Sequence, residues 1–381
     1  MRVIRSIALA GAAVAALALG AGAAFADPPA ADNPPPPQSV VAGGSDTITA
    51  LFDQFQTDYD ATSPTWPLYS WDATGSSTIV SKNDPSNTTT PPCEMNRPNG
   101  SSSGITQLND DQDFTYDNTT YQCLDLARTS RNLGSSDPAG LVQIPFARDL
   151  ISYSYVSGGN AVANLTFTDL QAIYNCNAGL ISSSDPDAPV TWNEVGGTST
   201  DAIVPVLPQN GSGTRSSWLT DLGITTVPSC VVNGTSTVDG SVIEENEGTD
   251  SEFTSANPSV DDVLFPFSGA DYVAEVYTGF DTTQSPGSLV LGDIQGDAPL
   301  TVDSSGDTVI NISGFYAKFD RTVNVVAKST GSSPYVPSYL QALVGAGNNS
   351  GWICKNATAK TDIANYGFAT DPTCGIAIVN Y

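Results

Sequence analysis

Glycine and small hydroxyl residues gather in three short stretches, each between an apolar run and a helical pattern. In one of them, residues 210–215 read NGSGTR, the apolar run 202–209 precedes them, and helical spacing of apolar residues starts at Trp218. Ser212 and Thr214 therefore lie at a predicted helix start, where free backbone N–H groups and the positive end of the helix dipole favour an anion. This pattern predicts an oxyanion-binding loop.

Two further stretches have the same order of residue types. Residues 40–59 read VVAGGSDTITALFDQFQTDY, and residues 97–108 read RPNGSSSGITQL. A single capped helix start needs no ligand. Three such loops, if the fold brings them together, direct several N–H and O–H donors to one small oxyanion. Because a hydrogen bond to a charged group contributes about 1.5–3 kcal/mol, a few of them hold an anion tightly.

Positive charge is scarce in this chain, which has 13 Lys and Arg against 40 Asp and Glu and a formal net charge of −27. Several arginines nevertheless lie in or beside stretches rich in Gly, Ser or Thr, or in the apolar segment after one. The planar guanidinium suits bidentate binding of oxyanions, although each could instead neutralise a buried carboxylate. These arginines are Arg97, Arg128, Arg131, Arg148 and Arg215.

Histidine is absent from the sequence, which excludes Ser-His-Asp and Cys-His nucleophiles and histidine metal sites. The acidic balance leaves no basic patch for nucleic acid. After the N-terminal segment no apolar run reaches the ~20 residues of a membrane span, so we expect no membrane insertion. We also expect a monomer with no cofactor and no metal.

The N-terminal segment has the features of a secretory signal peptide, with two arginines before an apolar run and the small-residue pattern AFA ending at Ala26. The residue directly after the predicted cleavage site is Asp27, not the cysteine of a lipoprotein. We therefore expect a secreted protein without a lipid anchor, in the extracellular or a periplasm-like space. Residues 27–39 are predicted to form a proline-rich spacer, and the remaining length suits two lobes, each with a core of its own.

Six cysteines form an even set in a chain predicted to be exported, which favours disulfides. Six cysteines allow 15 pairings. We favour pairing of nearest neighbours, because it closes three compact loops. The predicted pairs are Cys93 with Cys123, Cys176 with Cys230, and Cys354 with Cys374.

Nine short motifs occur in order after residue 39: GGSDTITALFDQF, RPNGSSSGI, CLDLARTSR, LVQIPFARDLISYSY, LTFTDLQAIY, NGSGTRSSWL, EENEGTD, FDRTVNVV and GWIC. In order and spacing they resemble the phosphate-binding proteins of ABC importers, in the form exported by actinobacteria. The resemblance implies an α/β fold of the type II periplasmic-binding-protein class, with two lobes joined by crossover strands and a ligand enclosed between them by hinge closure. Residues 40–148 and 269–381 would form the first lobe, and residues 149–268 the second.

The coarse pattern of the sequence agrees with this fold class, because strand, loop and helix units alternate as α/β folds require. Alternation of apolar and polar residues in two later stretches, 288–294 and 307–328, predicts antiparallel strands there.

The resemblance also implies which residues bind the anion. The family's arginine before the third loop aligns with Pro208, and its proton-accepting carboxylate aligns near Ser130, so other residues must take these two roles. The choices for the cation are Arg128, Arg131 and Arg215, and those for the acceptor are Asp46 and Asp125. The ligands carried over are Thr47, the N–H of Ile48, Ser101, Ser212, Gly213 and Thr214, with Ser45, Ser102 and Ser130 as further candidates.

The function expected from the sequence is capture of inorganic phosphate or a related oxyanion, without catalysis, with an ABC importer permease as partner. One alternative is a secreted phosphatase-like hydrolase that uses the same loops, with an Asp or Ser nucleophile and a carboxylate metal site. The acidic clusters at 109–113 and 302–307 could bind calcium for it, although solvated polar turns explain them more simply. The other alternative is a surface module that has lost its ligand.

Overall fold

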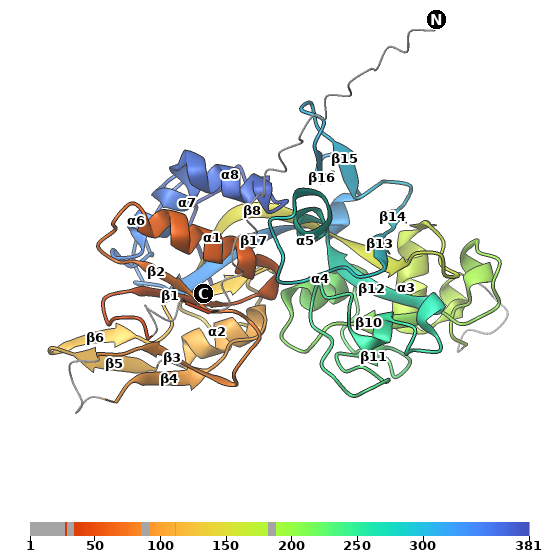
Figure 1. The fold of residues 1–381 in the computed structure, drawn as a ribbon, viewed down its shortest axis with the longest axis horizontal. Helices are drawn as coiled ribbons and strands as arrows, with labels where there is room; N and C mark the ends of the chain where they lie inside the picture. The colour runs from red at the N-terminus through yellow and green to blue at the C-terminus, as the bar shows by residue number, and fades with distance from the viewer. Residues whose placement is uncertain (1–26, 29–33, 85–90, 111, 182–187, 381) are drawn as a thin grey trace, which may run out of the picture.

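The computed structural model describes residues 27–28, 34–84, 91–110, 112–181 and 188–380. The predicted signal peptide lies outside these residues. Figure 1 shows two α/β lobes side by side, one built from the red-to-orange and blue parts of the chain and the other from its yellow-to-green middle. Within the described residues, no helix has both the length and the apolar character needed to cross a bilayer.

The helices and strands alternate along most of the chain. The helices are α1 (Thr49–Asp60), α2 (Ser101–Asn109), α3 (Phe167–Asn175), α4 (Gly213–Leu222), α5 (Gly269–Val273), α6 (Gln341–Val344), α7 (Gly351–Lys355) and α8 (Ala357–Asn365). The strands of the main sheet are β1 (Val40–Gly44), β2 (Leu68–Ser70), β7 (Leu126–Thr129), β8 (Leu141–Val156), β10 (Val204–Leu207), β11 (Val232–Asn233), β12 (Val263–Ser268), β13 (Leu289–Leu291), β17 (Asp320–Lys328), β18 (Ala369–Thr370) and β19 (Ile378–Asn380). The remaining strands form small pairs: β3 (Thr78–Lys82) with β4 (Cys93–Asn96), β5 (Asp113–Tyr116) with β6 (Thr119–Gln122), β9 (Asn164–Leu165) with β14 (Asp293–Ile294), and β15 (Leu300–Val302) with β16 (Thr308–Ile310).

One 11-stranded sheet runs through both lobes. Eight of its strands follow the order β11-β10-β12-β8-β17-β7-β1-β2, and β13, β18 and β19 each pair with β8 beside this path. Strands β1 and β7 are short, fully buried and parallel to each other, which is typical of sheets covered by helices on both faces. The predicted α/β fold class is confirmed. The predicted antiparallel pairing is confirmed for β13 and β17, which both pair antiparallel with β8. It is wrong for the end of the first predicted stretch, because β14 pairs parallel with β9.

Strands β8 and β17 connect the two lobes, and Figure 1 shows them running between the lobes. Strand β8 is 16 residues long and almost entirely buried. The register of β17 against β8 shifts between Val323 and Asn324, opposite Ala147 and Pro145. Because proline has no N–H to donate, the ladder is weakened at this point.

The second lobe receives a contribution from a later part of the chain. Strand β13 pairs with the end of β8, and β14 pairs with β9. The predicted division assigned both strands to the first lobe. The division of residues into lobes remains a prediction, but these pairings connect residues 289–294 to strands that lie before α3.

The helices cover the sheet through apolar faces that the sequence pattern predicts. In α1, Leu51, Phe52, Phe55 and Tyr59 are buried, at helical spacing. Phe52 and Phe55 pack edge to face with Phe146 of β8, at ring-centroid distances of 5.7 and 6.2 Å.

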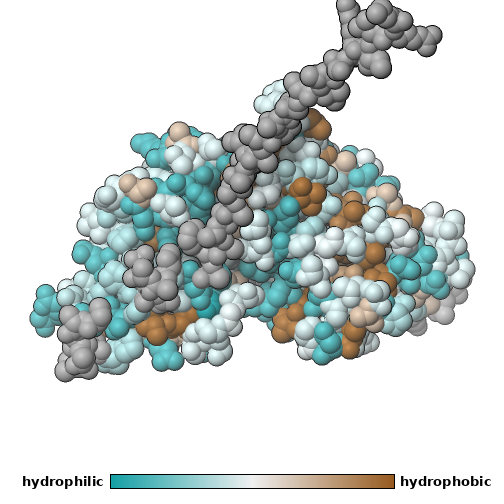
Figure 2. Space-filling view, in the orientation of Figure 1, coloured by the Kyte–Doolittle hydropathy of each residue, from teal (hydrophilic) through white to brown (hydrophobic). Residues whose placement is uncertain are grey.

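The face of the molecule drawn in Figure 2 is mainly hydrophilic or neutral, with apolar residues scattered over it.

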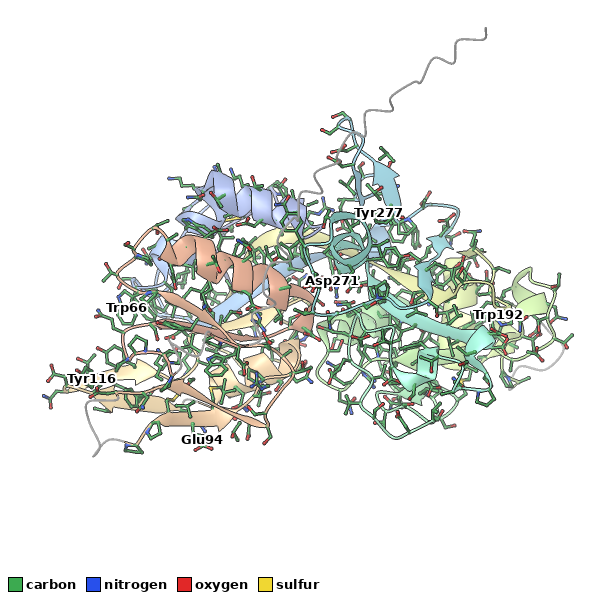
Figure 3. The ribbon with its side chains drawn as sticks, in the orientation of Figure 1. Trp66, Glu94, Tyr116, Trp192, Asp271 and Tyr277 are labelled. Carbon is green, nitrogen blue, oxygen red and sulfur yellow. A yellow bond between two sulfur atoms is a disulfide. The ribbon has the colours of Figure 1, made fainter. Side chains whose placement is uncertain are left out.

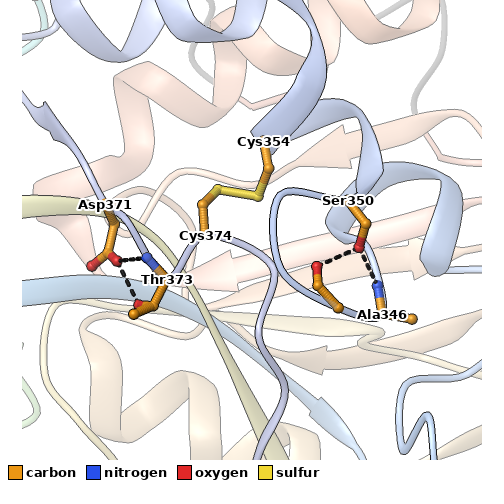
Figure 4. The surroundings of a disulfide bond; sticks show 7 residues. Ala346, Ser350, Cys354, Asp371, Thr373 and Cys374 are labelled. Atoms are coloured by element: carbon orange, nitrogen blue, oxygen red, sulfur yellow. Dashed lines mark hydrogen bonds between the residues drawn. A yellow bond between two sulfur atoms is a disulfide. The ribbon is translucent and has the colours of Figure 1, made fainter.

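Three disulfides join the cysteines in the predicted nearest-neighbour pairs, and no described cysteine is free. Cys354 of α7 is bonded to Cys374, in the segment between β18 and β19 (Figure 4). Asp371 accepts hydrogen bonds from the backbone N–H and the hydroxyl of Thr373 in the same segment. This disulfide therefore ties the C-terminal strands to the helical layer of the first lobe.

Candidate anion-binding site

Three loops meet where parallel strands end. Strand β1 leads into Ser45, β7 leads into Ser130, and β10 leads into the loop before α4. The carboxyl ends of parallel strands are the usual place for ligand sites in α/β folds. Two helices start here as well, α2 at Ser101 and α4 at Gly213, and the first turn of α4 offers free N–H groups and the positive end of its dipole.

Donors of two of these loops, those after β1 and β10, converge on the side chain of Glu245, which is fully buried. One carboxylate oxygen, Oε1, accepts from the backbone N–H groups of Asp46 and Thr47 and from the Thr47 hydroxyl, each at 3.1 Å, and from the Ser45 hydroxyl at 3.4 Å. The other, Oε2, accepts from the Thr214 N–H at 3.2 Å and from the Ser212 hydroxyl. These six hydrogen bonds hold one anionic group, which makes the site an oxyanion site in its chemistry.

A second group of hydroxyls surrounds this carboxylate. The Oγ atoms of Ser45 and Ser130 lie 2.9 Å apart, and the hydroxyls of Ser101 and Ser130 lie 3.4 Å apart. Thr47 and Thr214 bring their hydroxyls to 3.3 Å of each other across the lobe boundary. The predicted residues of all three loops therefore lie in one cluster, and hydroxyls can rotate to donate to a larger anion.

Gly213 is required by the close meeting of these loops. A Cβ atom at this position would overlap the Oγ atoms of both Ser101 and Ser130. The absence of a side chain lets α4 approach the first lobe, and it also leaves the first N–H groups of that helix uncovered. Gly213 thus contributes by its missing side chain and by its place at the helix start.

Arg321 of β17 places its guanidinium beside these donors. It is not among the three arginines predicted for the cation. Its Nη1 donates to Thr214 Oγ1 at 2.9 Å and to the Ser130 carbonyl at 3.2 Å. Its Nη2 forms an ion pair with Asp149 at 2.6 Å. Asp149 also accepts from the Ser268 hydroxyl and the Ala270 N–H. The scarcity of arginines was a usable signal for Arg321, whereas nothing local in the sequence indicates Asp149 as its partner.

Asn246 and Asp271 complete the surroundings of the carboxylate. Asn246 has a positive φ of 62°, and its side-chain amide donates to Thr47 Oγ1 at 3.4 Å and to Asp271. Burial, followed by the charge of Asp149, raises the pKa of Asp271 well above its usual range. Figure 3 shows Asp271 near the junction of the lobes. The raised pKa favours the neutral form of this carboxyl beside the site.

Asp46 and Ile48 take roles other than those predicted. The N–H groups that reach the carboxylate belong to Asp46 and Thr47, one position before the predicted N–H of Ile48, whose side chain is in the core. The Asp46 carboxyl accepts from the Gln284 amide at 2.8 Å. Burial, followed by the charge of Glu245, raises the pKa of Asp46 well above its usual range. The raised pKa favours the neutral form of Asp46 at this position.

Arg128 and Asp125 bond to residues away from the carboxylate. Arg128 is fully buried and donates to the Ser70 and Thr49 hydroxyls and to the Trp71 carbonyl. Asp125 forms an ion pair with Lys82 at 2.7 Å. It also accepts from the Val41 N–H and the Tyr339 hydroxyl. Both residues hold the first lobe together, which is the structural alternative that applies to buried charges.

Arg215, Arg131 and Ser102 also bond elsewhere. Arg215 donates to the Pro208 carbonyl and to Asn233 within the second lobe. Arg131 forms an ion pair with Asp137 at 2.7 Å and donates to the Ser102 hydroxyl. The Ser102 N–H donates to the Gly211 carbonyl at 3.0 Å, so Ser102 links the loops rather than facing the carboxylate.

A polar cleft of about 460 Å³ opens beside the site, between the first lobe and α4. Arg131 and Arg321 line it from one side, and Ser216 and Ser217 line it from the start of α4. It reaches Arg321, whose guanidinium donates to Thr214 behind it. Among the described residues no group of His, Cys, Asp or Glu is arranged to hold a metal ion. The acidic stretch at 302–307 forms a turn around Asp303, which accepts from two backbone N–H groups of its own loop.

Residues 29–273 match the family model described as the PBP superfamily domain. Among solved structures, the chain is similar to an ABC-type phosphate transport receptor from Vibrio cholerae, at 18% identity and a TM-score of 0.51, over 87% of this chain and 100% of that one. It is also similar to a protein from Clostridium perfringens described as a substrate-binding protein of a phosphate ABC transporter with bound phosphate, at 16% identity and a TM-score of 0.52, over 87% of this chain and 99% of that one. No curated protein matches the chain significantly.

Proposed function

The chain belongs to the PBP superfamily, and from this premise we propose that it captures inorganic phosphate, or a similar tetrahedral oxyanion, between its lobes for an ABC importer. Two similar solved structures support the proposal, because one is described as a phosphate transport receptor and the other contains phosphate. The function is capture and delivery to a permease, without a catalytic step.

The observation that carries the proposal is the convergence of donors from two loops, one in each lobe, on one anionic group. Five residues, spread over two lobes, donate six hydrogen bonds to the Glu245 carboxylate. Ser101 and Ser130 add hydroxyls beside it, and phosphate has more oxygens than a carboxylate to accept from them. Because the donors belong to both lobes, an anion held there keeps the lobes closed.

Arg321 compensates part of the negative charge of a bound anion. Its guanidinium reaches Thr214 while Asp149 holds it in place. A buried, paired arginine of this kind attracts an oxyanion less than a free one would, so most of the affinity comes from the N–H and hydroxyl groups. The overall negative charge of the chain does not prevent such local binding, because the donors are fixed dipoles that act at short range.

The proposed location is outside the cytoplasm, in a secreted or periplasm-like position, with the protein acting as a monomer. The three disulfides support this part of the proposal, because such bonds persist in oxidising compartments. Mass spectrometry of the protein purified from culture supernatant and from cells would test both the export and the cleavage after Ala26.

Isothermal titration of the chain with phosphate, sulfate, arsenate and a phosphonate tests the binding function. We expect saturable binding of phosphate at one site. Thr214→Val should reduce the affinity by at least about tenfold, because it removes a hydroxyl between Arg321 and the anion. Thr57→Val is the matched control, since the Thr57 hydroxyl bonds only within α1 and is exposed. Absence of binding for all four anions would contradict the proposal.

A further inference from the structure

Glu245 occupies the place at which the donors of both lobes point. Asp46 and Thr47, in the first lobe, bond to one of its carboxylate oxygens, and Ser212 and Thr214, in the second lobe, bond to the other. The side chain is fully buried. It therefore has the contacts of a bound oxyanion, although it belongs to the chain itself.

The backbone around Glu245 is fixed by its own hydrogen bonds. The Gln284 amide donates to the Glu245 carbonyl at 2.9 Å. On one side, the Glu244 carboxylate accepts from the Asn99 amide at 3.1 Å, across the lobe boundary. On the other side, Asn246 accepts from the Ser268 N–H at 3.0 Å. The segment thus presents the carboxylate to the donors as part of the folded structure.

The same donors cannot hold this carboxylate and an external oxyanion together. Each N–H has one hydrogen to donate, and two buried anions at hydrogen-bonding distance repel each other strongly. A glutamate whose role was only to accept a hydrogen bond from bound hydrogen phosphate would lie beside the cluster of donors. It would leave the centre of that cluster free for the phosphate. Glu245 instead takes the N–H groups at the centre.

We propose that Glu245 is an internal ligand of the oxyanion site, which fills the site in the ligand-free protein and which an external oxyanion must displace. This inference rests on the proposed function, because it names the group that competes for the same donors. Competition of this kind lowers the affinity for all tetrahedral anions alike. A proton-accepting role would instead favour hydrogen phosphate over sulfate.

Titration of Glu245→Ala with phosphate and with sulfate separates these two roles. We expect both anions to bind at least about tenfold more tightly than to the unmodified protein, a change of ~1.4 kcal/mol. Glu247→Ala is the matched control, because it removes the same charge two residues away, where, among the described residues, the carboxylate accepts hydrogen bonds from Thr249 alone. It should leave both affinities unchanged. Weaker phosphate binding together with stronger sulfate binding in Glu245→Ala would overturn the proposal.

Amide hydrogen exchange without any added anion tests the internal ligand independently of phosphate binding. In Glu245→Ala the N–H groups of Asp46, Thr47 and Thr214 lose their acceptor, so we expect at least about tenfold faster exchange there than in the unmodified protein and in Glu247→Ala. Unchanged exchange would overturn the proposal. If neither protein bound phosphate while exchange increased as expected, the phosphate function would fail and the internal ligand would stand.

Discussion

Ser212 has two hydrogen-bonding roles that a substitution removes together. Its hydroxyl accepts from the Arg215 N–H at 3.0 Å as the N-cap of α4, and it also donates to Glu245. We expect Ser212→Ala to lower the free energy of unfolding by about 1 kcal/mol through the lost cap and to weaken phosphate binding. Ser216→Ala, on the same helix, should leave binding intact, because its hydroxyl bonds only to the Ser212 carbonyl. Urea unfolding and calorimetric titration measure the two effects.

The two most buried arginines should differ in their effect on binding. Lysine keeps the charge but has no planar fork, so both Arg321→Lys and Arg128→Lys should lower the free energy of unfolding, by about 1–3 kcal/mol. We expect only Arg321→Lys to weaken phosphate binding, by at least about tenfold, because Arg321 bonds to Thr214 whereas Arg128 bonds to Ser70 and Thr49. Equal losses of affinity in the two variants would contradict this assignment.

Single residues of the site differ in how far the sequence could predict them. Ser45, Thr47, Ser212 and Thr214 were predictable, because glycine and hydroxyl residues before a helix have a recognisable local order. Glu245 was not, since the chain has 40 acidic residues and the local sequence does not tell which of them is buried among donors. The pairs that determine its surroundings, such as Arg321 with Asp149, join residues far apart in the chain.

At the scale of elements, a carboxyl pair between α1 and α8 makes their packing sensitive to pH. Burial, followed by the charge of Asp58 and a hydrogen bond to it, raises the pKa of Asp362 to about 7. The folded state therefore binds this proton more tightly than the unfolded state, in which an aspartate has a pKa of about 3.9. The resulting stability is complete below about pH 4 and is lost as the pH rises toward about 7.

We expect Asp362→Asn to remove this component of the pH dependence, because asparagine has no proton to lose. The unmodified protein should show the steeper fall in the free energy of unfolding between pH 4 and pH 7, relative to the variant. Urea unfolding at several pH values measures both curves. Parallel curves for the two proteins would show that Asp362 does not titrate in this range.

Elements with local signals were predictable, and their pairing partners were not. The buried face of α1 and the strands before the three loops follow from helical spacing and short apolar runs. The pairing of β17 with β8 and β7 does not, because a strand with alternating apolar residues fits many neighbours equally well. The same reason explains why β13 and β14 pair with strands of the other predicted lobe.

At the scale of the whole molecule, the net charge of −27 should slow the approach of an anion. Long-range repulsion acts over about 30 Å at 10 mM salt and over about 8 Å at physiological salt. We therefore expect the association rate constant of phosphate to rise severalfold as NaCl increases over this range. Stopped-flow fluorescence at constant pH measures it. A rate that falls with salt would indicate that a positive local field at the cleft governs the approach.

The position of β17 in the sheet has a consequence for the order of folding in time. This strand lies between β8 and β7 although it is synthesised after both of them. A nascent chain that ends before Asp320 therefore has two open strand edges, and it cannot join the halves of its sheet. We expect a chain ending at Phe319 to bind a hydrophobic dye and to aggregate, unlike the full chain. Late insertion of one strand therefore delays completion of the fold until most of the chain has been synthesised.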